Sequence, residues 1–156
     1  MKKINIAVVG LGQIGNYLLH ELNSKKKDIE LKTGKQINVV AISAKNINKK
    51  RKYKINKKLF FKNPLDIFKF KKIDILFESI GLSGGISKKV VEKAIRNKVH
   101  VITPNKALIA KHGDYLSKLA EKHKVNLEFE ASVAGGIPIL RTCLLYTSPS
   151  PRDPWT

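Results

Sequence analysis

The sequence has very little cysteine, methionine and tryptophan, with one of each in 156 residues. The single Cys143 excludes an internal disulfide, which agrees with a reducing compartment. No run of about 18 apolar residues is present, so the sequence predicts no membrane span. The first residues enter a strand pattern without a cleavage site, which argues against a signal peptide. We therefore expect a cytoplasmic protein without a membrane partner.

Acidic residues are also scarce. The chain has 12 Asp and Glu against 31 Lys and Arg, which gives a formal net charge of +19. Such a charge attracts phosphate backbones, and a nucleic-acid binder would show steeply salt-dependent DNA affinity. However, 27 of the basic residues are Lys, scattered without the Arg and aromatic residues of a base-stacking surface. We therefore do not expect a nucleic-acid partner.

Apolar segments of strand length alternate with segments of helical periodicity along the chain. The expected strands are residues 3–9, 37–43, 73–77, 99–102 and 125–130, and the expected helices are residues 14–22, 64–70, 86–97 and 105–122. A polar run at residues 23–28 is expected to end the first helix, and about twenty Lys- and Asn-rich residues after residue 43 predict a solvated loop or edge segment. The alternation predicts an α/β fold with a Rossmann-like, doubly wound parallel sheet.

Three glycines follow the first expected strand. Gly10, Gly12 and Gly15 have the spacing of a dinucleotide-binding turn that opens a helix. In such a turn the first glycine permits the tight bend, the second lets the backbone approach a pyrophosphate, and the third lets helix pack on strand. The alternative is a purely structural turn between strand and helix.

The end of the second expected strand lacks the acidic residue that would bind the ribose of NAD. The segment Ile42-Ser43-Ala44-Lys45 offers a hydroxyl and a cation instead, so NADP is at least tolerated. Asp28 and Glu30 precede this strand, and we interpret them as solvated loop charges.

Small and polar residues follow the third expected strand. Glu78-Ser79-Ile80-Gly81 and then Ser83-Gly84-Gly85 leave room for a flat ring, as in a wall beside the nicotinamide. An ordinary helix entry with a serine cap explains the same residues, and both interpretations stay open.

Lys106 follows the fourth expected strand in the segment Thr103-Pro104-Asn105-Lys106. A lysine that faces a cofactor cleft can orient a carbonyl and donate a proton, although Lys106 is also one of many surface lysines. At the end of the fifth expected strand, residues 128–138 combine a carboxylate with small residues whose carbonyls can converge on a hard cation. A glycine-rich turn into a helix is the alternative there.

The last fifteen residues differ from the rest in composition. Residues 142–156 contain no Lys, Ile or Asn, but they hold the only Cys and Trp and three of the six Pro. This segment has no periodicity, and we favour a tail joined on artificially, similar to a translated adaptor or cloning read-through, over a native disordered tail. We therefore expect a dinucleotide-binding domain at residues 1–141 and a non-native or disordered tail at residues 142–156.

Taken together, four segments resemble homoserine dehydrogenase. These are residues 9–15, residues 77–81, residues 101–110 with the Asn-Lys-Ala sequence, and residues 129–139 with the Glu-Ala-Ser-Val-Ala-Gly-Gly-Ile-Pro sequence. Their order and spacing match that family over residues 3–141. The resemblance implies reduction of aspartate 4-semialdehyde to homoserine by NADPH or NADH, on the route to threonine and methionine.

The resemblance also implies roles for particular residues. A cofactor-binding set would hold the pyrophosphate and border the nicotinamide: Gly10, Gly12, Gln13, Ile14, Gly15, Ser79 and Lys106. Lys106 would also stand beside the substrate as the catalytic residue. A sodium-type monovalent cation would be held by the Glu130 carboxylate and the carbonyls of Val133, Gly135 and Ile137.

Members of that family continue into a second domain, which carries the substrate-binding carboxylates and a second, proton-donating lysine. That substrate-binding domain is missing here, because 156 residues accommodate a single domain. Hydride transfer needs donor and carbonyl held together in a water-poor site, so we expect this chain to be inactive by itself. Its full-length parent is expected to be a homo-oligomer. The alternative is a non-catalytic module that senses the dinucleotide.

Overall fold

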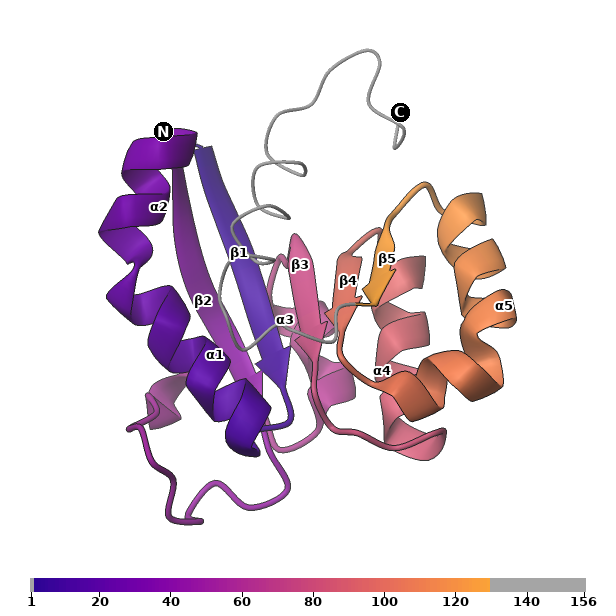
Figure 1. Cartoon of the computed structure of the whole chain (residues 1–156), viewed down its shortest axis with the longest axis horizontal. Coiled ribbons are helices and arrows are strands. Elements are labelled where there is room, and N and C mark those ends of the chain that lie inside the picture. The colour runs from indigo at the N-terminus through magenta and orange to yellow at the C-terminus, as the bar shows by residue number, and fades with distance from the viewer. Residues whose placement is uncertain (1, 130–156) are drawn as a thin grey trace.

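Five parallel strands form one sheet in the order β2-β1-β3-β4-β5 (Figure 1). The structure, a computed structural model, describes residues 2–129. The strands are β1 (Lys2–Val9), β2 (Lys35–Ser43), β3 (Ile75–Glu78), β4 (His100–Thr103) and β5 (Leu127–Phe129). After β2 the chain crosses to the other side of β1, so the winding direction reverses between β1 and β3. In doubly wound sheets, ligands bind outside the carboxyl ends of the strands at such a reversal.

The helices cover both faces of the sheet (Figure 1). One face packs against α1 (Gln13–Ser24) and α2 (Lys26–Thr33), and the other packs against α3 (Ile67–Phe70), α4 (Gly85–Arg96) and α5 (Lys106–Lys122). Two short 3-10 turns, η1 (Lys57–Leu59) and η2 (Pro64–Asp66), lie between β2 and β3. No helix within residues 2–129 is both long and apolar enough to cross a membrane.

The central strand β1 is apolar on both sides because it is covered on both faces. Ile6 and Val8 point into the core beneath α1, whereas Ala7 and Val9 point into the core shared with α4 and α5. Side chains of a strand alternate between faces, so a continuous apolar run is what burial on both faces requires. The predicted doubly wound parallel sheet is confirmed.

Each predicted strand and helix is found with shifted ends, and one helix was missed. The polar run of residues 23–28, which was expected to end the first helix, contains the start of α2 at Lys26; this second helix buries Ile29 and ends at Gly34, which has a left-handed conformation. Asp28 and Glu30 therefore lie in a helix, so their interpretation as loop charges was wrong.

Residues between β2 and β3 form the irregular edge that the sequence predicted. The segment returns to β2 once, where Phe61 N donates to Ile42 O at 2.8 Å. Asn63 then caps η2, because its side-chain oxygen accepts from Leu65 N at 3.0 Å and Pro64 takes the first helical position. The expected helix of residues 64–70 is thus a 3-10 turn that continues into α3.

Candidate functional site

The glycine turn joins β1 to α1 at the reversal point of the sheet. Gly10 has a φ of 87°, which glycine adopts readily, and its N–H donates to Ser43 O at 2.8 Å. Gly12 precedes α1 as its N-cap, with no side chain bonded to the first amides of the helix. These free N–H groups and the helix dipole attract an anion.

Each glycine in the turn meets different surroundings. A Cβ atom on Gly10 would lie 2.5 Å from Ile80 N, and one on Gly15 would overlap the carbonyl oxygen of Gly10. In contrast, a Cβ on Gly12 would have no atom within 4 Å. Gly10 and Gly15 therefore permit close packing of the protein itself, whereas Gly12 faces open space in front of the helix terminus.

Ser79 holds the turn from the neighbouring strand. Its hydroxyl donates to Gly10 O at 2.6 Å, and its N–H donates to Val9 O at 2.8 Å. The glycine turn and the end of β3 are thus one connected unit.

The start of α4 lacks the serine cap that was one of the two interpretations of this loop in the sequence. Gly84 is the N-cap of α4, and no side chain bonds to the helix start. The hydroxyl of Ser87, which is inside the helix, instead accepts from Leu82 N at 3.1 Å.

A buried carboxylate joins the ends of β3 and β4. Glu78 has no exposed surface, and Thr103 Oγ1 donates to Glu78 Oε1 at 2.7 Å. The other oxygen, Oε2, accepts from Ile80 N at 2.8 Å and from Gly81 N at 3.2 Å, and Asn105 Nδ2 lies 3.3 Å from Oε1. Each carboxylate oxygen thus accepts from two donors, so Glu78 joins the loops at the carboxyl ends of β3 and β4.

Asn105 connects this network to α5. Its side-chain oxygen caps the helix by accepting from Leu108 N at 3.1 Å, while its Nδ2 donates to Leu82 O at 2.8 Å. Lys106 is the first residue of α5, and its side chain is exposed beside the capped end. Lys106 therefore lies at the same sheet edge as the glycine turn, two strands away.

The four predicted cation ligands cannot be placed. Glu130, Val133, Gly135 and Ile137 lie outside the described residues. Within residues 2–129, no group of three or more His, Cys, Asp or Glu could hold a metal ion.

Two polar residues near the turn were not anticipated from the sequence. Asn16 is buried in α1, where its side chain accepts from Tyr53 N and donates to Tyr53 O, both at 2.9 Å. Arg51 Nε donates to Leu11 O at 2.9 Å. Both contacts join residues that are 37 or more positions apart in the sequence. The one feature of the sequence that could have indicated them was a lone arginine, Arg51, within a lysine-rich segment.

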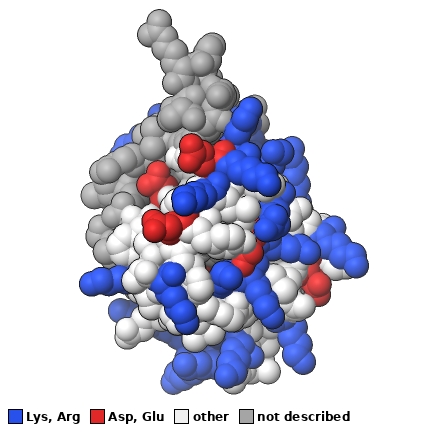
Figure 2. Space-filling model, turned by 90° about the vertical axis from the view of Figure 1, so that its right-hand side faces the viewer, with Lys and Arg blue, Asp and Glu red and all other residues white. Residues whose placement is uncertain are grey.

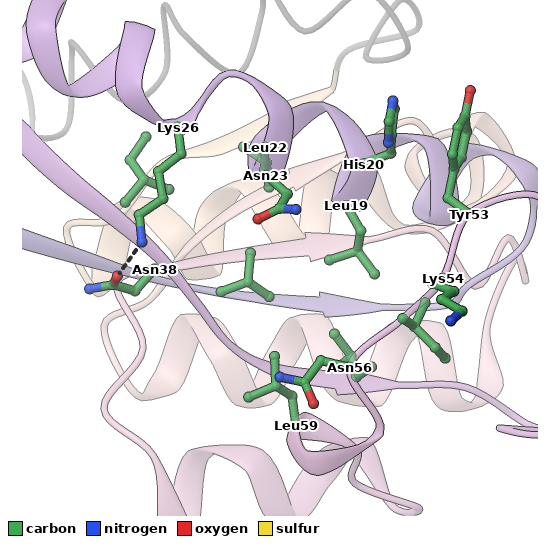
Figure 3. Close-up of a pocket in the computed structure, with 14 residues that line it drawn as sticks. Leu19, His20, Leu22, Asn23, Lys26, Asn38, Tyr53, Lys54, Asn56 and Leu59 are labelled. Atoms are coloured by element: carbon green, nitrogen blue, oxygen red, sulfur yellow. Dashed lines mark hydrogen bonds between the residues drawn. The ribbon is translucent and has the colours of Figure 1, made fainter.

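A cavity of about 660 Å³ lies away from the glycine turn, at the outer edge of the sheet. Figure 3 shows Leu19 and Leu22 of α1 opposite Leu59, with Lys26 Nζ reaching Asn38 Oδ1 at 3.4 Å. At one end the rings of His20 and Tyr53 stack with centroids 3.8 Å apart. None of residues 10–15 lines this cavity, so the cavity is separate from the glycine turn.

On the face shown in Figure 2, lysine and arginine side chains are dispersed, and some carboxylates lie among them. This distribution differs from a single basic stripe with stacked aromatic residues.

One titratable group outside the site gives a testable pH dependence. His123 Nε2 is buried without a hydrogen-bond partner in the described part of the chain. Burial lowers the pKa of His123, and three positive charges lower it further: Lys98, Arg96 and Lys122. The folded state therefore binds a proton less readily than the unfolded chain, so stability present above the unfolded pKa of about 6.5 should be lost as pH falls below it towards the lower pKa of the folded state.

Replacement of His123 should reduce this pH dependence. We expect His123→Gln to give a smaller decrease in unfolding free energy than the unsubstituted chain as pH falls from about 7 to 5. Urea unfolding at a series of pH values measures both slopes. Equal slopes in the two proteins would contradict the assignment.

The fold and the turn define a class: this is a dinucleotide-binding α/β domain. Residues 10–130 match the family model described as homoserine dehydrogenase, NAD binding domain. The chain belongs to this family.

Homoserine dehydrogenases are also similar to the chain over most of its length. That of Neisseria gonorrhoeae is 37% identical over 141 residues, which cover 90% of this chain and 32% of the relative. That of Bacillus subtilis is 33% identical, with 91% and 33% covered. The solved structure of S. aureus homoserine dehydrogenase at pH 7.5 superposes with a TM-score of 0.75 at 34% identity, covering 84% of this chain and 34% of that chain. The chain thus spans about a third of the length of these relatives.

Proposed function

We propose that this chain is the cofactor-binding part of an oxidoreductase that reduces aspartate 4-semialdehyde to homoserine with NADPH or NADH. The supporting observation is the open face of Gly12, which lies before uncapped helix amides at the reversal point of the sheet. The similarity to proteins named homoserine dehydrogenase supports the choice of substrate.

The residues of the turn fit the pyrophosphate of a dinucleotide. Space free of atoms in front of Gly12 would admit phosphate oxygens to hydrogen-bonding distance of the backbone. The amides of Gln13, Ile14 and Gly15 belong to the first turn of α1, where no intrahelical acceptor exists for them. Gly10 and Ser79 would hold this cradle in shape through the Ser79 hydroxyl.

Lys106 would act at the other end of the cofactor. Neighbouring strands are about 4.8 Å apart, so the end of β4 lies roughly 10 Å from the end of β1 along the sheet edge. This distance lets a dinucleotide reach from the glycine turn to Lys106. The cofactor supplies a hydride when bound. The Lys106 ammonium would orient the substrate carbonyl and provide a proton to its oxygen.

Three further proposals concern parts of the protein beyond the described residues. Residues 1–141 form the NAD(P)-binding domain, and residues 142–156 are not part of it. A monovalent cation binds between the Glu130 carboxylate and the carbonyls of Val133, Gly135 and Ile137. The complete enzyme contains a substrate domain and is a homo-oligomer.

Cofactor titration of the 156-residue chain tests the proposed function. We expect saturable binding of NADPH or NADH, followed through nicotinamide fluorescence, and no oxidation of homoserine when NADP⁺ or NAD⁺ is supplied as the hydride acceptor. Gly12→Val should weaken binding by roughly tenfold or more, since each lost charge-assisted hydrogen bond costs about 1.5–3 kcal/mol. Its melting temperature should stay unchanged, because a Cβ at Gly12 meets no atom and the backbone φ of −73° suits any residue.

Gly113→Ala is the matched control, since it adds bulk in α5, away from the turn. This variant should bind the cofactor as the unsubstituted chain does. If neither NADPH nor NADH binds to the folded chain, the proposal fails.

Sequencing of the source gene across the codon for Arg141 separates the enzyme from the sensor. A reading frame that continues for about two hundred residues with a second α/β pattern supports the enzyme. A natural stop near Arg141 supports a non-catalytic dinucleotide sensor.

A further inference from the structure

The cavity at the outer edge of the sheet has no part in the proposed function. Its volume of about 660 Å³ is typical of sites for small molecules. The walls are largely aliphatic and come from three parts of the chain: Leu19 and Leu22 of α1, Ile37 and Val39 of β2, and Ile55 and Leu59 of the segment between β2 and β3. Such walls favour contact with the apolar part of a ligand.

We propose that this cavity, here called the outer cavity, binds a small amphipathic carboxylate. The apolar body of the ligand lies against the aliphatic walls, and its carboxylate lies at Lys26. The outer cavity is separate from the glycine turn, so this inference goes beyond the proposed function and does not depend on it.

The local sequence places a cation beside the aliphatic wall. Four lining residues are spaced as i, i+3, i+4 and i+7, which puts them on one face across the end of α1 and the start of α2: Leu19, Leu22, Asn23 and Lys26. Figure 3 shows these residues along one side of the outer cavity. The lysine therefore extends an apolar stripe instead of standing on the opposite, solvent-facing side.

Lys26 provides an ammonium group that no described carboxylate neutralises. Its Nζ bonds to the neutral Asn38 Oδ1 at 3.4 Å, which is long for a hydrogen bond. The preceding cation differs, since Lys25 Nζ pairs with Glu21 Oε2 at 2.8 Å. A ligand carboxylate at Lys26 would gain a charge-assisted hydrogen bond, which is stronger than the present bond between the ammonium and a neutral amide.

No acidic residue opposes an anion in the outer cavity. None of its fourteen lining residues is Asp or Glu, and Lys54 adds a second cation at the other end (Figure 3). Among the described residues, neither Lys26 nor Lys54 forms an ion pair. A carboxylate therefore enters a region of uncompensated positive charge.

The wall formed by the segment between β2 and β3 is held at both ends. Asn16 binds the N–H and the carbonyl of Tyr53, both at 2.9 Å, and Phe61 N donates to Ile42 O at 2.8 Å. The rings of His20 and Tyr53 are stacked with centroids 3.8 Å apart at one end of the outer cavity. Because the wall is fixed before a ligand enters, binding loses less conformational entropy.

A second copy of the chain fits this charge pattern poorly. The chain has a formal net charge of +19, so another copy would bring further cations towards Lys26 and Lys54. A small carboxylate instead supplies the missing negative charge, and its apolar body removes aliphatic surface from water.

Titration of the 156-residue chain with octanoate, octanol and acetate tests this inference. Octanoate has a carboxylate and an apolar body, whereas octanol lacks the first and acetate lacks the second. We expect octanoate to bind roughly tenfold tighter than either, with an advantage over octanol that shrinks as salt is added. Methyl NMR signals of Leu19, Val39 and Leu59 should shift, whereas those of Leu108 and Leu116 in the opposite core should not.

Lys26→Gln should weaken octanoate binding to the level of octanol, while octanol binding and the melting temperature stay unchanged. Lys27→Gln is the matched control, because this neighbouring residue of α2 is exposed and does not line the outer cavity. The control removes the same charge and should bind octanoate as the unsubstituted chain does.

Several results would overturn the inference: no octanoate binding, octanol binding as tight as octanoate, or equal weakening in the Lys26 and Lys27 variants. Displacement of octanoate by NADPH would show that the probe occupies the cofactor site instead. Self-association in sedimentation experiments that octanoate does not reverse would identify a second copy as the occupant, and it would also overturn the inference. Octanoate binding at these methyl groups in a chain that binds neither NADPH nor NADH would support the inference while the proposed function fails.

Discussion

Glu78→Ala should destabilise the domain by about 3 kcal/mol or more, because two buried and two part-buried donors would lose their acceptor at once. The buried donors are the Thr103 hydroxyl and Asn105 Nδ2, and the part-buried donors are the N–H groups of Ile80 and Gly81. Each buried donor left without a partner costs about 1–3 kcal/mol. For a domain of this size the melting temperature should fall by roughly 6–12 °C.

The comparison with Glu78→Gln shows which property of Glu78 matters. Glutamine retains one carbonyl oxygen but presents an NH₂ group to the remaining donors, so it should recover only part of the loss. Asp114→Ala removes an exposed acid from α5 and should change stability by no more than about 0.5 kcal/mol. Thermal unfolding by circular dichroism measures all three variants. A Glu78→Ala domain that melts within about 2 °C of the unsubstituted chain would contradict this role.

This network also explains how the fold positions Lys106. Glu78 binds Thr103 and Asn105, and Asn105 caps the helix that begins with Lys106. The buried carboxylate thus connects the end of β3, which holds the glycine turn through Ser79, to the start of α5. One hydrogen-bonded network therefore supports both ends of the proposed cofactor site.

The sequence was sufficient to predict the order of strands and helices, because the periodicity is local. The strand residues 3–9 are apolar on both faces, and the glycine turn directly follows them. The helix α2 was missed because only Ile29 among its eight residues is buried, so it has no apolar stripe. The left-handed Gly34 at its end was the available signal.

Contacts between distant segments could not be predicted from local patterns. In the sequence pattern of α1, Asn16 looks like a polar residue on the solvent face of the helix. In the structure it is buried and bonds to Tyr53. Arg51 reaches Leu11, forty residues earlier in the chain. The sequence indicated that Glu78 ends a strand, but its donors come from a neighbouring strand and two loops whose approach depends on the tertiary fold.

Lys106→Ala should lower kcat of a complete enzyme by about 10²- to 10⁴-fold, the range that a positioned general acid contributes. The relevant protein is the longer one in which residues 1–141 continue into a substrate domain. The dissociation constant for NADPH should rise far less than kcat falls, because the pyrophosphate turn two strands away stays intact and the variant loses cofactor contacts only at the nicotinamide end. Steady-state assays of homoserine oxidation and cofactor titration give the two values.

Lys106→Arg distinguishes the two tasks proposed for this lysine. Arginine retains the positive charge but does not give up its proton, so it can orient a carbonyl without protonating its oxygen. If orientation dominates, the arginine variant should recover much of the lost turnover; if proton transfer dominates, it should be as slow as the alanine variant. Lys111→Ala, on the same helix, should retain full activity. Unchanged turnover in Lys106→Ala would exclude a catalytic role, while cofactor binding at the glycine turn could still hold.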